Sequence, residues 1–184
     1  IYNQAPIISS QKIKNTHLEG VLKGKGYVKD GTVIEESMDF SEKNYASIEE
    51  LNQILKRIIF PKQFSKNEQF KIEQEDYFFL RYWMSRTPNE VTIPFYDRET
   101  FFDSYGKFFI YGDKKGEMTN TTRIYNKVGL AYGTTTDVAY VKDRNGIEFF
   151  LTATILTNKN EIFNDNNYEY DQLGIPFLAA LGRE

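Results

Sequence analysis

The sequence has no cysteine and a single histidine, His17, among its 184 residues. The lack of cysteine excludes disulfides, thiolate zinc sites and a cysteine nucleophile. One histidine excludes metal sites built on a pair of histidines, and a Ser-His-Asp triad would depend on His17 alone. This residue lies in the polar stretch KNTHLEG with no nucleophile motif beside it, so we interpret it as a loop residue. If the chain takes part in nucleophilic chemistry, lysine and carboxylate groups must therefore handle the protons.

A long apolar run and a net basic charge are also lacking. No run approaches the roughly 18 residues needed to cross a bilayer as a helix, and the first residues, IYNQAPIISS, lack the order of a secretion signal. Lys and Arg number 23 against 26 Asp and Glu, so no basic field favours a nucleic-acid backbone. We expect no nucleic-acid partner and no transmembrane segment in this chain. Because the first residue is not Met, we expect the chain to begin inside a longer product.

The apolar and aromatic residues, 40% and 16% of the chain, are enough to bury the core of a single domain or of a large part of one. We expect one partial domain over residues 1–184. Residues 1–46 are expected to form a loop and a small β-ribbon, with Asp30-Gly31 as its turn signal. Residues 47–112 should form a helical part, and residues 122–184 a three-stranded meander with a C-terminal helix. This segregation predicts an α+β fold with helices packed on an antiparallel sheet.

Three helices are predicted in the helical part. The first is preceded by a capping box of Ser47 and Glu50 and ends at Pro61. Its apolar residues at helical spacing are Ile48, Leu51, Ile54, Leu55 and Ile58. The second covers residues 74–85, with an apolar stripe of Tyr77, Leu80, Trp83 and Met84. The third, over residues 97–112, has an aromatic stripe that we interpret as core; its expected caps are Asp97 and Gly112.

After Thr122 the pattern changes to that of strands. Three β-rich runs, TRIYNKVGLAYG, TTDVAYVKD and IEFFLTATIL, follow one another, and the turn signal RNG joins the second to the third. Such short connections predict adjacent antiparallel strands. The third run alternates only partly, which suits a strand covered on both faces. A polar loop then leads to a final helix, predicted from about Pro176.

Lys127 and Gly129 lie two positions apart in the first of these runs, RIYNKVGLAYG. Side chains two apart share a face of a strand, so both should point to the side of Arg123 and Tyr125, while Val128 and Leu130 point to the other side. A glycine leaves room for a ligand or another backbone, and a lysine beside it offers a cation to a carboxylate. The alternative is a solvated edge lysine beside a bulge glycine.

Lys-x-Gly on a strand, followed by two antiparallel strands and a helix, resembles the end of the serine β-lactamase and penicillin-binding-protein fold, where the motif reads Lys-Thr-Gly or a near relative. More broadly, the chain resembles the C-terminal portion of a bacterial serine hydrolase family related to class A β-lactamases. The stretches that carry the resemblance are MDFSEKNYASIEELNQILKRIIFP, FDSYGK, RIYNKVGLAYG, DVAYVKD, EFFLTATI and NDNNYEYDQLGIPFLAALGR, which together cover roughly residues 24–184.

The resemblance implies acyl transfer and hydrolysis on an amide or ester, such as a β-lactam or a peptidoglycan-like substrate, with no cofactor and no metal. Lys127 would be the cleft cation, Gly129 the position of close approach, and the backbone N–H of Leu130 an oxyanion-hole donor. The sequence departs from the pattern at Val128, where the family has Thr or Ser and where a hydroxyl would bind the substrate carboxylate. Two neighbours on the strand either orient substrate or are structural: Arg123 and Asn126.

The nucleophile is expected upstream, because the Ser-x-x-Lys and Ser-Asp-Asn motifs of the family precede this region. Two local Ser-x-x-Lys matches, Ser9 to Lys12 and Ser104 to Lys107, and the loose Ser-x-Asn match at Ser65 are interpreted as chance. Ser9 lies in a polar coil, and Ser104 is expected in the middle of a helix. The partner of this chain would then be the N-terminal half of the same protein, in an exported or periplasmic location, with a possible lipid anchor.

Two other hypotheses remain open. The chain can belong to a non-catalytic relative that binds a cell-wall fragment or a protein partner, or it can be an unrelated α+β interaction domain, in which case Lys127 lies exposed with no cleft beside it. The acidic loop FNDNNYEYD offers oxygen ligands for Ca²⁺ but lacks the glycine and the spaced glutamate of a known calcium loop. We interpret it as a solvated loop; its acidic residues are Asp165, Glu169 and Asp171.

Overall fold

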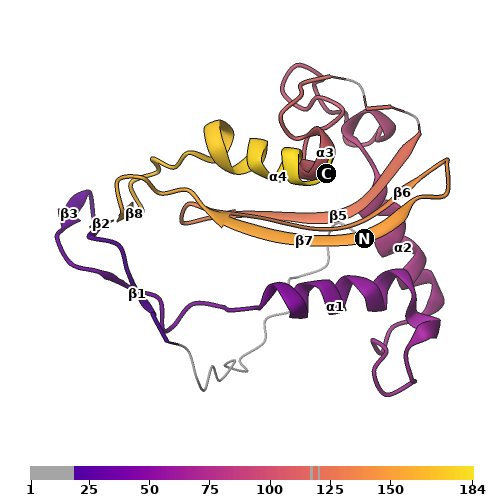
Figure 1. Cartoon of the computed structure of the whole chain (residues 1–184), viewed down its shortest axis with the longest axis horizontal. Helices are drawn as coiled ribbons and strands as arrows, with labels where there is room; N and C mark the ends of the chain where they lie inside the picture. The colour runs from indigo at the N-terminus through magenta and orange to yellow at the C-terminus, as the bar shows by residue number, and fades with distance from the viewer. Residues whose placement is uncertain (1–18, 117, 120) are drawn as a thin grey trace.

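The computed structural model describes residues 19–116, 118–119 and 121–184. At its centre is an antiparallel sheet with the strand order β5-β6-β7. Its strands are β5 (Thr122–Ala131), β6 (Thr134–Asp143) and β7 (Glu148–Leu156). Figure 1 shows this sheet between α4 on one face and α1 on the other. The predicted meander and the α+β class are confirmed.

One face of the sheet is covered by α3 (Phe108–Tyr111) and α4 (Ile175–Leu181), which pack on each other. A π-helical turn, η3 (Tyr170–Gly174), leads directly into α4, close to the predicted start of the final helix. The core on this face consists of Phe108, Phe109, Ile124, Ala139, Val141 and Leu178. Phe109 and Leu178 are completely buried, so the C-terminal helix is anchored on the sheet by apolar packing.

The other face is covered by α1 (Ile48–Ile59), with α2 (Gln74–Ser85) packed beside it. The predicted capping box of α1 is present, because the side chains of Ser47 and Glu50 each accept the backbone N–H of the other. The core on this face consists of Leu55, Ile59, Val138 and Tyr140. Strand β6 contributes buried residues to both cores. Strand β7 is also covered on both faces, as predicted for the third run, because Phe149 and Leu151 pack against the first core and Phe150 against the second.

The four strands that precede α1 belong to two smaller sheets, one of which also contains β8 (Ile162–Phe163) (Figure 1). One pairs β1 (Leu22–Lys23) with β4 (Met38–Asp39). The other has the order β3-β2-β8, and its strands are β2 (Gly26–Lys29), β3 (Thr32–Ile34) and β8. The predicted turn is present: Asp30 and Gly31 both have positive φ, 50° and 78°, as a two-residue hairpin turn requires. Aromatic residues join these ribbons to the rest, around the buried core of Met38, Phe40 and Phe163.

The predicted helix over residues 97–112 is wrong. Turns occupy most of this segment, and α3, four residues long, contains non-helical backbone at Phe109 and Ile110. Asp97 caps a single turn by accepting the N–H of Thr100. Gly106 has a φ of 76°, which a helix does not accommodate. The segment therefore folds as a loop over the sheet; the two remaining short helices, both 3₁₀, are η1 (Pro61–Gln63) and η2 (Pro88–Glu90).

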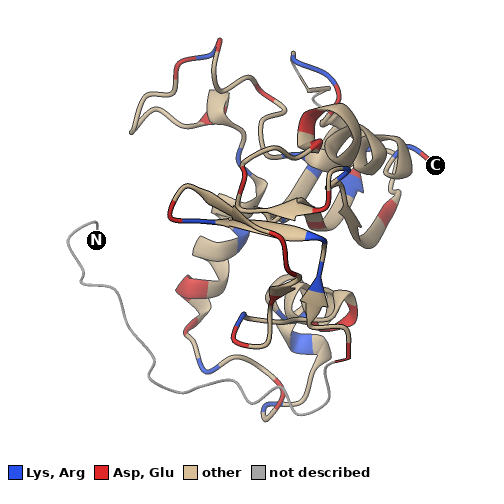
Figure 2. Ribbon diagram, turned by 90° about the vertical axis from the view of Figure 1, so that its left-hand side faces the viewer, with Lys and Arg blue, Asp and Glu red and all other residues tan. Residues whose placement is uncertain are grey.

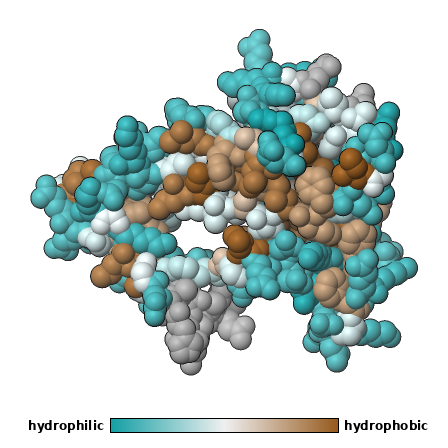
Figure 3. Space-filling view, viewed as in Figure 1, coloured by the Kyte–Doolittle hydropathy of each residue, from teal (hydrophilic) through white to brown (hydrophobic). Residues whose placement is uncertain are grey.

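The outer edges of β5 and β7 have no neighbouring strand within the described ranges. Apolar side chains near both edges are exposed: Leu130, Ile147 and Leu156. Figure 3 shows hydrophobic side chains gathered over the sheet and hydrophilic ones around them, and Figure 2 shows acidic and basic residues interspersed. No helix in the described part of the chain combines the length and the apolar character of a membrane span.

Candidate functional site

The Lys127-Val128-Gly129 stretch lies in the middle of the edge strand β5. Lys127 is exposed, and its ammonium group donates to the carbonyl of Val128 at 2.7 Å. Gly129 is also exposed, and no described atom lies within 4 Å of the place where a Cβ would be. The strand therefore presents a lysine and an open glycine to solvent beside an unpaired edge. Lys127 lines none of the three cavities found among the described residues.

Val128 and Leu130 differ in their environment although they share a face of the strand. Val128 packs against the core under α3 and α4, as expected from the alternation of side chains. Leu130 is 46% exposed, near the end of β5. An apolar residue at position 128 thus has a packing role. The roles of Val128 in substrate binding and of the Leu130 backbone N–H in an oxyanion hole stay predictions.

Arg123 lies at the beginning of β5, four residues before Lys127. At the usual rise of a strand this separates their backbones by about 13 Å. One guanidinium nitrogen, Nη1, donates to both carboxylate oxygens of Glu90, at 2.8 and 2.7 Å, and to the carbonyl of Ser85 at 3.2 Å. Arg123 therefore joins η2 and the end of α2 to the sheet, and the structure does not bring it to Lys127.

Asn126 is buried, with 7% of its surface exposed, and all of its polar atoms are bonded. Its Nδ2 donates to the carbonyl of Gly106 at 2.8 Å and to both carboxylate oxygens of Asp137 at 3.0 and 3.1 Å. Its Oδ1 accepts from Lys107 at 2.8 Å. Asp137 also accepts the backbone N–H of Phe109 at 3.2 Å. Asn126 is thus the central residue of a buried polar cluster consisting of Lys107, Asn126 and Asp137.

The ammonium group of Lys107 donates three hydrogen bonds, all to protein acceptors. They go to the carbonyl of Met84 at 2.7 Å, to the carbonyl of Ile124 at 2.9 Å and to Asn126. The side chain is 4% exposed. The loop over the sheet, the end of α2 and strand β5 therefore meet at a single ammonium group. Such a fully bonded buried charge holds elements together, whereas an unbonded one would be very costly.

Burial shifts the pKa values of this cluster in opposite directions. It raises the pKa of Asp137 to about 6, although the hydrogen bonds from Asn126 and Phe109 favour the carboxylate. It lowers the pKa of Lys107 to about 8, although the negative charge of Asp137 opposes the shift. At pH 7 both groups are therefore mainly charged, as a buried pair of opposite sign. Sequence reasoning missed Lys107 and Asp137 as partners; the available signal was a charged residue inside each of two apolar runs, GKFFIY and TDVAYV.

The local Ser-x-x-Lys match at Ser104 has no nucleophilic geometry. Ser104 lies in a turn rather than in the middle of a helix, is 2% exposed, and donates its hydroxyl proton to the carbonyl of Lys114 at 2.5 Å. The ammonium of Lys107 is bonded elsewhere. Ser65 donates its hydroxyl to the carboxylate of Glu68 at 2.7 Å. Three residues considered from the sequence lie outside the described ranges: Ser9, Lys12 and His17.

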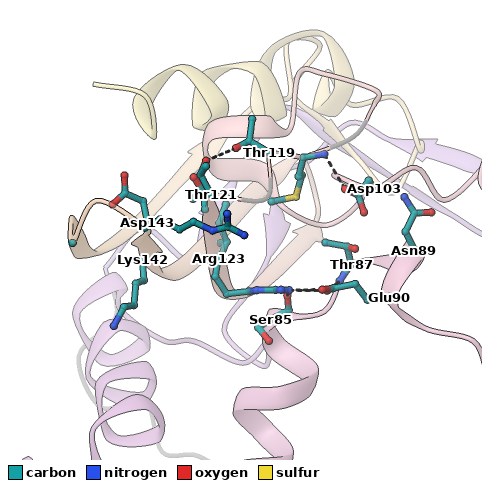
Figure 4. Close-up of a pocket in the computed structure, with 15 residues that line it drawn as sticks. Ser85, Thr87, Asn89, Glu90, Asp103, Thr119, Thr121, Arg123, Lys142 and Asp143 are labelled. Atoms are coloured by element: carbon teal, nitrogen blue, oxygen red, sulfur yellow. Dashed lines mark hydrogen bonds and ion pairs between the residues drawn. The ribbon is translucent and has the colours of Figure 1, made fainter.

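A cavity of about 770 Å³ lies at the beginning of β5, between η2 and the β6–β7 turn (Figure 4). Charged residues of both signs line it: Glu90, Asp103, Arg123, Lys142, Asp143 and Arg144. Most of these charges already have structural partners. Arg123 is paired with Glu90, Asp103 accepts the N–H of Met118 at 2.8 Å, and Asp143 accepts backbone N–H groups of its own turn. The charged groups of this polar cavity therefore mainly form hydrogen bonds and ion pairs that stabilise the fold.

The acidic loop before α4 holds its carboxylates by local bonds. Asp165 accepts from the side chain of Asn160 and from the N–H of Asn167, and Glu169 accepts the N–H of Lys159. Among the residues that the structure describes, no three His, Cys, Asp or Glu side chains lie together in a group that could hold a metal ion.

Comparison with known proteins assigns no family to the chain. No protein-family model, no curated protein and no solved structure matches the chain.

Proposed function

We propose that the chain forms one wall of the active site of a serine hydrolase of the β-lactamase and penicillin-binding-protein type, which transfers and hydrolyses the acyl group of an amide or ester. The observation that carries the proposal is the edge strand β5, which presents Lys127 and an open Gly129 side by side next to an unpaired sheet edge. Lys127 would attract the substrate carboxylate. The nucleophilic serine would come from a preceding segment of the protein.

The surroundings of β5 support this proposal. An unpaired edge can bind an extended ligand through backbone hydrogen bonds, a common mode of peptide recognition. Gly129 lets such a ligand approach the strand closely, and the N–H of Leu130 would complete an oxyanion hole. The strand, hairpin, strand and helix order, with α4 packed on the sheet, agrees with the resemblance. An exported location belongs to the same proposal.

The test uses the protein as its gene encodes it, with any residues that are encoded before Ile1. Incubation with a fluorescent penicillin and with a fluorophosphonate should give a covalent adduct, detected by mass spectrometry. Lys127→Met should slow labelling by penicillin about tenfold or more, because a hydrogen bond to a charged group is lost. Lys62→Met, at an exposed lysine in η1, is the matched control and should label at the normal rate. The absence of any adduct from folded protein would exclude the catalytic function.

A non-catalytic binding module is the second candidate. It is favoured by the structural bonding of Ser104 and Lys107, which leaves the described residues without a Ser-x-x-Lys pair in nucleophilic geometry. The exposure of Lys127, which lines none of the three cavities found among the described residues, instead matches the expectation for an unrelated α+β interaction domain. The binding module predicts that no Ser-x-x-Lys motif is encoded in the preceding couple of hundred codons. It also predicts that a soluble peptidoglycan fragment binds without forming an adduct. Sequencing the gene upstream and an equilibrium binding measurement distinguish the two candidates.

A further inference from the structure

A second cavity lies beyond the end of β5, where the β5–β6 turn meets the loop that follows β8. Its volume is about 370 Å³, within the range of about 300 to 1,000 Å³ typical of ligand sites. Three tyrosines, two asparagines and two apolar residues of β5 line it: Tyr132, Tyr168, Tyr170, Asn164, Asn166, Leu130 and Ala131. No charged side chain of the described residues belongs to the lining. The lining side chains are therefore uncharged, aromatic and rich in hydrogen-bonding groups, and the charge next to them is the ammonium group of Lys43, 5.2 Å from the ring centroid of Tyr132.

The hydrogen bonds of the tyrosines leave donors free for a ligand. The phenol oxygen of Tyr168 accepts the N–H of Asn164 at 2.8 Å, and that of Tyr170 accepts the N–H of Gly133 at 2.7 Å. Because each oxygen acts as an acceptor, its own proton stays available. Burial raises the pKa of both phenols, so the protons remain in place at neutral pH. The side-chain amide of Asn166 has no hydrogen-bond partner among the described residues and offers both a donor and an acceptor.

The backbone around this cavity is held in unusual conformations. Six non-glycine residues of the described chain have positive φ, and three of the six line the cavity: Tyr132, Asn164 and Asn166. Tyr132, with a φ of 52°, precedes Gly133 in the two-residue turn between β5 and β6. Asparagine is the usual residue at such a position, and the Cβ of an aromatic residue is disfavoured there by contact with the backbone. Contact of the ring with Phe40, at 5.2 Å between centroids, offsets part of this destabilisation.

We propose that this cavity binds a neutral carbohydrate, with N-acetylated hexosamines preferred. The apolar C–H face of a sugar ring would lie on the tyrosine rings, and the free phenol protons would donate to its oxygens. The Asn166 amide would pair with the acetamido group. The amides and hydroxyls of the lining disfavour lipids. The site goes beyond the proposed hydrolase function, because it requires neither a nucleophile nor Lys127.

The experiment is a calorimetric titration of the full chain with the trimer of N-acetylglucosamine, with cellotriose for comparison. Asn166→Gly keeps the positive φ without strain and removes the amide, so the affinity should fall about fivefold at unchanged stability. Tyr132→Asn restores the favoured Asn-Gly turn while removing the ring, and should weaken binding about tenfold or more. Asp30→Gly, at the same conformation in the β2–β3 turn, is the matched control and should bind as the wild type does.

Binding of the N-acetylglucosamine trimer that weakens in both cavity variants, but not in Asp30→Gly, supports the site. The proposal is overturned if the folded wild-type chain binds neither sugar, or if Asn166→Gly and Tyr132→Asn bind as tightly as the wild type. It is also overturned if trialanine binds while both sugars fail, since the cavity would then recognise peptide. Urea unfolding of each variant shows whether it is folded. Covalent labelling is a separate readout, so failure here leaves the hydrolase proposal standing.

Discussion

Lys107 and Lys127 both place an ammonium group beside strand β5, in opposite surroundings. Lys107 is 4% exposed and donates to two carbonyls and to Asn126, whereas Lys127 is exposed and donates to the carbonyl of the next residue along the strand. The first has exchanged water for fixed protein acceptors, so its charge stabilises one arrangement of loop, helix and sheet. The second is exposed to solvent, and under the proposed function it would bind the substrate carboxylate. A lysine in a strand or loop is thus structural or functional according to the acceptors that tertiary structure provides.

Lys107→Met is the change with the largest expected effect. It leaves the carbonyls of Met84 and Ile124 and the side chain of Asn126 without their donor, and Asp137 without its compensating charge. Breaking a buried arrangement of this kind costs about 3 to 5 kcal/mol. Urea unfolding followed by far-UV circular dichroism measures the loss. A loss below about 1 kcal/mol would show that water replaces the ammonium group and that the cluster does not hold the loop.

Asp137→Asn tests the same cluster through its pH dependence. The pKa of Asp137 is about 6 in the fold against 3.8 as its ordinary value, so between these pH values the folded state binds more protons than the unfolded state. The free energy of unfolding contributed by this group therefore falls as pH rises from about 4 to about 6, by up to about 3 kcal/mol. Above pH 6 its contribution is constant.

The measurement compares wild type and Asp137→Asn by urea unfolding at pH 4, 5, 6 and 7. The stability of the wild type relative to the variant should fall across this range and then level off. The comparison within one pH removes the effect of other carboxylates, including Asp97 and Glu50, whose pKa values hydrogen bonds from neighbouring residues hold below the ordinary value. A difference that stays constant with pH would mean that Asp137 titrates as an ordinary carboxylate.

The elements that could be predicted from the sequence are those that local signals determine. The capping box at Ser47, the stop at Pro61, the Asp30-Gly31 turn and the alternation in β5 each act within a few residues. These features appear in the structure as expected. The exposed glycine at position 129 also follows from local pattern, because alternation alone assigns its face.

The loop over residues 97–112 and the buried cluster could not be predicted, because their cause is tertiary. The aromatic stripe of this segment fits a helix, but Lys107 in its middle finds its acceptors 23 residues before it, at Met84, and 17 and 19 residues after it, on β5. Asn126 and Asp137 meet only through the register of the β5–β6 hairpin, in which Asn126 lies opposite Ala139 and Asp137 opposite Val128. Without that register, Asn126 is an unremarkable strand residue.

Lys127→Met is the change with the smallest expected effect on stability and completes the comparison. The exposed ammonium loses one hydrogen bond to a backbone carbonyl that water can replace, so the free energy of unfolding should change by less than about 0.5 kcal/mol in either direction. Urea unfolding under the conditions used for Lys107→Met gives the two values side by side. If Lys127→Met instead cost more than about 1 kcal/mol, Lys127 would be a structural residue, and slower labelling of this variant by penicillin would report damage to the fold. A stable Lys127→Met variant makes the labelling rate a direct measure of what the exposed lysine does for a ligand.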